Sequence, residues 1–206
     1  MVLSVQRIKY LGNQIKRFRH RKGFGVHSPF AFRLITEVIE ESSPYYGYVA
    51  IEKAKSESGK KREMPSCKVL KLVFRLVNRF QPIQLIEVGP DSFLRLPAVL
   101  AKSNVRYLYE KTPFSLKKEE PFLADFVFIH HTALDADFEI LRNILLNVVH
   151  SNSLLVVSGI GHSKPMKTFW KKLQDDERVG ITFDLYDVGL VFFDLKMNKQ
   201  HYIVKF

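Results

Sequence analysis

The stretch Gln84-Leu-Ile-Glu-Val-Gly-Pro-Asp-Ser92 decides the fold. Its first five residues form an apolar run with the length of one β-strand, and the next four are residue types typical of turns. The preceding segment, 69–80, has the apolar spacing of a helix. A helix, a strand and a glycine turn in this order indicate one unit of an α/β fold.

Further strands follow this unit. Residues 105–109, 126–129 and 154–157 are short apolar runs, and a helix over about 137–149 joins the last two. Strands that are apolar on both faces favour a parallel sheet covered by helices. A helix over 165–174 then leads into three further strands (ITFDLY, GLVFFDL and HYIVKF) with no room for helices between them. The sheet is therefore expected to be mostly parallel with an antiparallel C-terminal end.

The N-terminal part has a different pattern. Ile8, Leu11, Ile15 and Phe18 recur at helical spacing opposite a basic face, and Gly23 and Gly25 end this helix. Ser28-Pro29 begins a second helix, with serine as the N-cap. We expect a basic helical extension over 1–52, an exposed linker over 53–68 and an α/β domain over 69–206.

Composition limits the possible functions. The 206 residues are 46% hydrophobic, and no apolar run reaches the roughly 20 residues of an integral membrane segment. No secretory signal is recognisable, so a cytoplasmic location is expected. Cys67 is the only cysteine, which excludes an internal disulfide. The net charge is +11, and the first 36 residues hold eight basic residues and no acidic one, so an anionic surface is a possible partner of this segment.

The strand and turn around Glu87 and Gly89 resemble the first motif of the class I S-adenosylmethionine-dependent methyltransferases. The basic helix, the GFGVHSPF stretch (Gly23 to Phe30) and the C-terminal DLYDVGLVFF and KQHYIVKF segments are similar to a group of bacterial methyltransferase-like proteins, including O-methyltransferase-like ones. The resemblance implies a Rossmann-like methyltransferase sheet. It also implies S-adenosylmethionine as a possible cofactor, with Glu87, Gly89, Asp91 and Glu110 as its binding residues and Glu110 on the ribose hydroxyls.

Three departures from this family pattern indicate a degenerate site. Pro90 to Phe93 replace the usual small residues and second glycine, and only residues 111–124 separate two strands that normally enclose a further strand and helix. Metal-dependent relatives carry carboxylates where this chain has His130 and Ser158-Gly159, so no metal is expected. These departures favour a pseudoenzyme or binding module over an active enzyme.

Two other functions remain open at this point. An active, metal-independent methyltransferase would use His130 or His162 to remove a proton from a small-molecule acceptor. An adaptor would bind a membrane or nucleic acid through the basic helix. The structural alternatives are that the histidines are polar loop residues, that Glu87 and Glu110 cap helices or pair with cations, and that the basic face is simply solvated. The sequence leaves the oligomeric state open.

Overall fold

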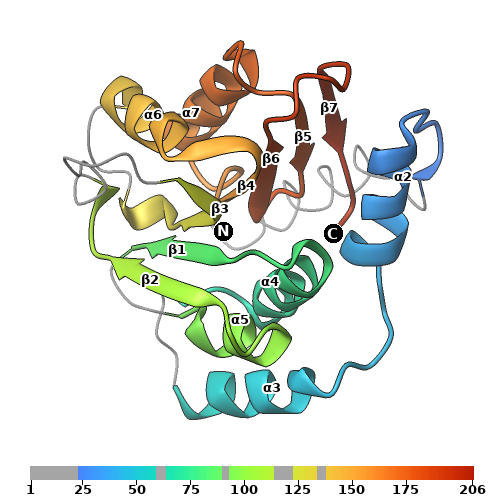
Figure 1. Cartoon of the computed structure of the whole chain (residues 1–206), viewed down its shortest axis with the longest axis vertical. Coiled ribbons are helices and arrows are strands. Elements are labelled where there is room, and N and C mark those ends of the chain that lie inside the picture. Colours follow the sequence, from blue (N-terminus) through green and yellow to red (C-terminus); the bar gives the residue numbers. More distant parts are fainter. Residues whose placement is uncertain (1–22, 59–63, 90–92, 114–122, 134–137) are drawn as a thin grey trace, which may run out of the picture.

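A seven-stranded sheet forms the centre of the computed structural model, which describes residues 23–58, 64–89, 93–113, 123–133 and 138–206 (Figure 1). The strand order is β2-β1-β3-β4-β6-β5-β7. The strands are β1 (Gln84–Val88), β2 (Arg106–Glu110), β3 (Ala124–Ile129), β4 (Val149–Ser158), β5 (Ile181–Asp184), β6 (Val188–Phe192) and β7 (Gln200–Ile203).

The direction of the strands agrees with the sequence pattern. Strands β2, β1, β3 and β4 pair in parallel, whereas β6 is antiparallel to both of its neighbours, β4 and β5. The last strand, β7, pairs with β5 in parallel. The predicted fold class, a mostly parallel sheet with an antiparallel C-terminal end, is confirmed.

Helices cover both faces of the sheet (Figure 1). The elements are α2 (Pro29–Leu34), the π-helical turn η2 (Ile35–Ile39), α3 (Gly47–Glu57), α4 (Cys67–Phe80), α5 (Arg95–Ala101), the short 3-10 helix η4 (His131–Ala133), α6 (Phe138–Asn147) and α7 (Lys164–Asp175). One core joins α2, η2, α4 and α5 to side chains such as Leu85 and Phe126. The other joins α6 and α7 to Ile86 and Val127, which alternate with the first pair along the strands.

The N-terminal helix α2 begins as the sequence predicts. The Ser28 hydroxyl accepts a hydrogen bond from the backbone N–H of Ala31 at 3.3 Å, and Pro29 occupies the first turn. Gly23 and Gly25 both have positive φ angles, which glycine adopts without strain. The predicted basic helix lies within residues 1–22, outside the described residues. Of the eight basic residues counted in the first 36, only Arg33 is described.

The predicted linker differs from the structure in its first part. Residues 53–57 are the last turns of α3, although none of their side chains is buried. The sequence is polar there because α3 buries little beyond Gly47 and Ile51. In addition, Ile35 and Ile51 share a core with Leu85 of the sheet, so the described part of the N-terminal extension packs against the α/β domain.

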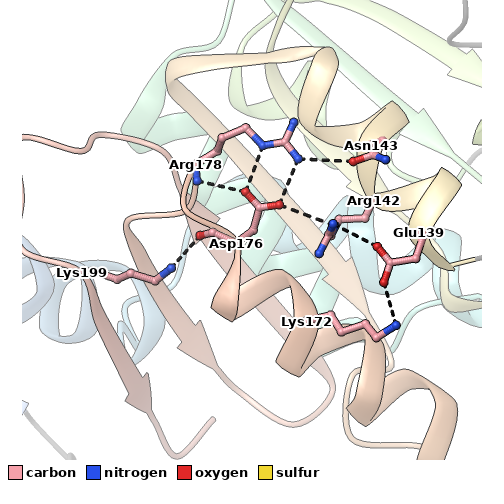
Figure 2. Close-up of polar contacts among 7 residues, drawn as sticks. All are labelled: Glu139, Arg142, Asn143, Lys172, Asp176, Arg178 and Lys199. Carbon is pink, nitrogen blue, oxygen red and sulfur yellow. Dashed lines mark hydrogen bonds and ion pairs between the residues drawn. The ribbon is translucent and has the colours of Figure 1, made fainter.

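A network of charged side chains joins α6, α7 and the C-terminal strands (Figure 2). The buried carboxylate of Asp176 accepts hydrogen bonds from the backbone N–H, Nε and Nη2 of Arg178, each at 3.0 Å. The Nε of Arg142 lies 3.6 Å from the same carboxylate, and the Nζ of Lys199 donates to the Asp176 carbonyl at 2.6 Å. This network lies where α7 ends and β5 and β7 begin, which is the edge of the sheet opposite to the carboxyl ends of the parallel strands.

None of the helices within the described ranges combines the length and the hydropathy that crossing a bilayer requires.

Candidate functional site

The carboxyl ends of β1, β2, β3 and β4 meet at one edge of the sheet. The register pairs Val88 at the end of β1 with both Glu110 of β2 and Ile129 of β3. Ligands of open α/β sheets bind at this edge. The predicted site residues Glu87, Gly89, Glu110 and His130 lie here because they are the last residues of these strands or the first residues after them.

Glu87 is fully buried and its carboxylate has several donors. The backbone N–H groups of Phe93 and Leu94 each donate to it at 2.9 Å, and Phe93 also lies 3.1 Å from its second oxygen. The hydroxyl of Tyr107 donates to the same carboxylate, and the Nε2 of His130 lies 3.1 Å from its Oε1. An ionised carboxylate can only accept, so the hydrogen of this imidazole is assigned to Nε2. The carboxylate is therefore engaged within the protein.

Gly89 provides space for a protein side chain. A Cβ built on Gly89 would lie 2.4 Å from Cδ2 and 3.0 Å from Cβ of His130, so the imidazole fills the space that a side chain would occupy. The backbone N–H of Gly89 donates to the Glu110 carbonyl, and its carbonyl accepts from Tyr109, both at 3.0 Å. Because Gly89 has no side chain, the His130 ring can lie directly against the Gly89 backbone.

His130 is one of two residues predicted to be catalytic, and it is only 1% exposed. Its ring is held by Glu87 and packs edge-on against Phe128 and Phe93, with centroid separations of 5.0 and 5.5 Å. A buried side chain with these contacts cannot reach an acceptor without rearrangement.

The predicted cofactor residue Asp91 belongs to 90–92, outside the described residues, while Glu110 is partly exposed.

The second predicted catalytic residue, His162, has a different environment. Its Nε2 lies 3.2 Å from Oδ1 of Asp187, and the two side chains are 45% and 43% exposed. The ring of His131 lies 5.6 Å from the His162 ring, and its Nδ1 is 3.2 Å from the hydroxyl of Ser158. These residues follow β3 and β4 or precede β6, at the same edge of the sheet. A carboxylate bonded to an imidazole orients the ring, so this pair can bind or exchange protons with a ligand.

The structure therefore divides the predicted site into two parts. Glu87, Gly89 and His130 form a closed cluster with Tyr107, whereas His162 and Asp187 form an exposed pair beside the partly buried His131 and the buried Ser158. Sequence reasoning missed Tyr107 and Asp187. Tyr107 could have been found from strand register, because it lies two residues before Tyr109, which pairs with Glu87. Asp187 gave no local signal, because its proximity to His162 arises from the antiparallel strand β6.

Metal binding was not expected from the sequence. Within the described ranges, no three His, Cys, Asp or Glu side chains gather in a way that could hold a metal ion. At the end of β3 the His130 imidazole is turned toward Glu87. The absence of a metal stays a prediction.

Comparison with solved structures identifies the fold. The chain is similar to the SAH-bound methyltransferase PaMTH1 of Podospora anserina, with a TM-score of 0.54 and 12% identity over 82% of this chain and 97% of that one. It is also similar to the O-methyltransferase TomG from Streptomyces achromogenes in complex with SAM, with a TM-score of 0.51 and 12% identity over 75% and 92% of the two chains.

A methyltransferase from Geobacter sulfurreducens is similar at a TM-score of 0.50 and 11% identity, over 75% of this chain and 92% of that one. No family model and no curated protein matches the sequence. The chain therefore has the Rossmann-like methyltransferase fold, and the identities are too low to carry an activity across.

Proposed function

We propose that this protein is a ligand-binding module on a methyltransferase fold, in which its own side chains close the site where the neighbours hold their cofactor. The observation that carries the proposal is the position of the His130 imidazole, which occupies the space beside Gly89 and is bonded to Glu87. PaMTH1 is solved with SAH and TomG with SAM, so this cofactor is the ligand that the proposal excludes from the closed cluster.

The residues of the closed cluster do not fit the cofactor. Glu87 has no exposed surface, and its carboxylate is already used by two backbone N–H groups and two side chains. A ligand near Gly89 would have to displace His130 and leave the buried Glu87 carboxylate without one of its partners, which costs about 1–3 kcal/mol or more. We infer that Glu87, Gly89 and His130 stabilise the fold and that Glu110 does not bind a ribose.

The exposed pair of His162 and Asp187 supports a binding role without methyl transfer. His162 and Asp187 are accessible to a small molecule, and His131 and Ser158 lie beside them. In this proposal the part of the edge that would hold an acceptor in a methyltransferase is retained, while the cofactor part is closed. An active enzyme needs both parts, because transfer requires the methyl carbon and the acceptor to be aligned.

Calorimetric titration of the full chain with S-adenosylmethionine tests the proposal. We expect no saturable heat up to millimolar ligand for the wild-type protein. Saturable binding in the micromolar range, weakened by Glu110→Ala, would overturn it, because Glu110 is where the family resemblance places the ribose carboxylate. A Glu177→Ala variant removes a carboxylate from another part of the surface and serves as the matched control.

A further inference from the structure

A second site lies between the end of η2, helix α4 and the C-terminal end of the chain. A cavity of about 380 Å³ is lined there by the apolar side chains of Ile39 and Phe206 and by the basic side chains of Lys68, Lys71, Arg75 and Lys205. We call it the basic pocket. In Figure 1 the C-terminal end of the chain lies beside α4 and near the end of the α2 segment, in agreement with these lining residues.

Two of the four cations are already engaged. Arg75 is buried, and it donates to the carbonyls of Val38 at 2.6 Å and Ile39 at 3.2 Å and to the hydroxyl of Tyr48 at 2.8 Å. Lys71 donates to Glu52. These bonds fix the two side chains in the wall of the pocket.

Lys68 and Lys205 are the cations available to a ligand. Neither forms a hydrogen bond or an ion pair with any residue of the described ranges, and the Nζ of Lys68 lies 4.2 Å from the ring centroid of Phe206. Lys68 also lies in the first turn of α4, which contains no acidic residue. A cation is unfavourable at this end of a helix, because the helix dipole is positive there. An anion in the pocket would relieve this repulsion.

The electrostatic environment of Lys68 also favours an anion in the basic pocket. Burial lowers the pKa of Lys68, and the neighbouring charges of Lys205 and Arg75 lower it further, while Asp187 acts in the opposite direction.

Two carboxylates also line the pocket. Glu41 is bonded to the backbone N–H of Ser43 at 2.6 Å, and Glu40 has an interaction of its own. Four cations against two carboxylates leave the side chains of the wall with a net positive charge.

We propose that the basic pocket binds the phosphate group of a small organic phosphate, with the organic part against Ile39 and Phe206. Lysine ammonium groups bind phosphate as point charges and do not impose the planar geometry with which an arginine fork selects carboxylates. The volume is at the lower end of the range for small-molecule sites.

The proposal is independent of the closed cofactor cluster. No residue of the basic pocket belongs to the group formed by Glu87, Gly89, Tyr107 and His130. A failed phosphate titration would therefore leave the proposal on S-adenosylmethionine untouched. Binding of S-adenosylmethionine would likewise leave the proposal on the basic pocket untouched.

Titration with phenyl phosphate and with inorganic phosphate at low ionic strength tests the site. We expect both to bind, phenyl phosphate more tightly, with affinity falling as salt is added. Lys68→Met and Lys205→Met should each weaken phenyl phosphate binding about tenfold or more, because each removes a charge-assisted bond. Lys68→Arg should retain most of the affinity.

Lys167→Met is the matched control, since Lys167 is an exposed cation on α7 outside the pocket and its loss changes the net charge equally. Binding that is unaffected by the pocket variants, or reduced as much by Lys167→Met, would overturn the proposal. So would the absence of binding by a wild-type protein that is folded by circular dichroism.

Discussion

The imidazole of His130 packs directly against Gly89, so that a Cβ at residue 89 would lie 2.4 Å from the ring. Gly89 is not in the left-handed region of backbone angles, where glycine is favoured for its conformation. The reason for glycine at this position is therefore space. The ring cannot move away freely, because its Nε2 is bonded to the buried carboxylate of Glu87.

The contact predicts an energetic coupling between residues 89 and 130. Gly89→Ala should destabilise the protein by about 1–3 kcal/mol, as expected for overpacking of a rigid site. In a His130→Gly background the same substitution should cost much less, since the clashing ring is gone. Urea denaturation of the two single variants and the double variant gives the coupling energy. A cost of Gly89→Ala that is equal in both backgrounds would contradict this contact.

Removal of the Glu87 carboxylate should be among the most damaging changes in the sheet. Glu87→Ala leaves two backbone N–H groups and the side chains of Tyr107 and His130 without their acceptor, and a loss of about 3–5 kcal/mol is expected. Glu52→Ala, which removes an exposed carboxylate paired with Lys71, should cost less than about 1 kcal/mol. Equal effects on the unfolding midpoint would show that Glu87 is not buried as described.

The Asp176 network predicts a specific dependence of stability on pH. The hydrogen bond from the Arg178 side chain holds the pKa of Asp176 below its usual value. The stabilisation is therefore fully present above the unfolded pKa of about 3.9 and is lost as pH falls through the lower folded value. Asp176→Asn should cost about 2 kcal/mol at neutral pH and progressively less as the pH falls through this range.

The neighbouring exposed residue Asp175 provides the control for this experiment. Its carboxylate pairs with Lys171 on the surface, so Asp175→Asn should change the free energy of unfolding little. Both variants are measured by urea denaturation between neutral pH and about pH 3. An Asp176→Asn variant whose cost does not decrease at acid pH would show that the network does not depend on the charge of this carboxylate.

The hydrogen bonds of Arg75 predict that this α4 side chain stabilises the N-terminal segment. Arg75→Lys keeps the charge but cannot reproduce the three bonds to Val38, Ile39 and Tyr48, so a loss of about 2 kcal/mol is expected. Hydrogen exchange should show faster exchange at residues 35–40 in this variant than in the wild type. Arg79→Lys, on the same helix but largely exposed, should leave both measurements close to those of the wild type. Unchanged exchange in Arg75→Lys would contradict this role.

The sheet could be predicted from the sequence because its signals are local. Strand β1 has the predicted bounds, and Ser28 caps α2 as its sequence context indicates. The antiparallel end followed from the short spacing of the last three strands. Helix α3 (Gly47–Glu57) was not predicted as a separate helix, because a helix that buries only Gly47 and Ile51 has little apolar periodicity.

The site was less predictable because side-chain direction depends on contacts that are distant in sequence. His130 and His162 look alike as polar residues after strands, yet His130 is buried against Glu87 and His162 is exposed beside Asp187. The turn of His130 toward Glu87 depends on a carboxylate 43 residues earlier. The pairing of His162 depends on Asp187, 25 residues later and just before β6. Neither relationship has a signal in the local sequence.

Amide signals in nuclear magnetic resonance spectra test the central claim most directly, because they report on the closed cluster itself. Spectra of the ¹⁵N-labelled protein with and without millimolar S-adenosylmethionine would follow the backbone N–H groups of Gly89, Phe93 and Leu94. The account predicts that these three signals do not move, since His130 already occupies the space beside Gly89 and Glu87 holds the other two amides. Saturable shifts of these signals would show that the cofactor enters there and would contradict the account.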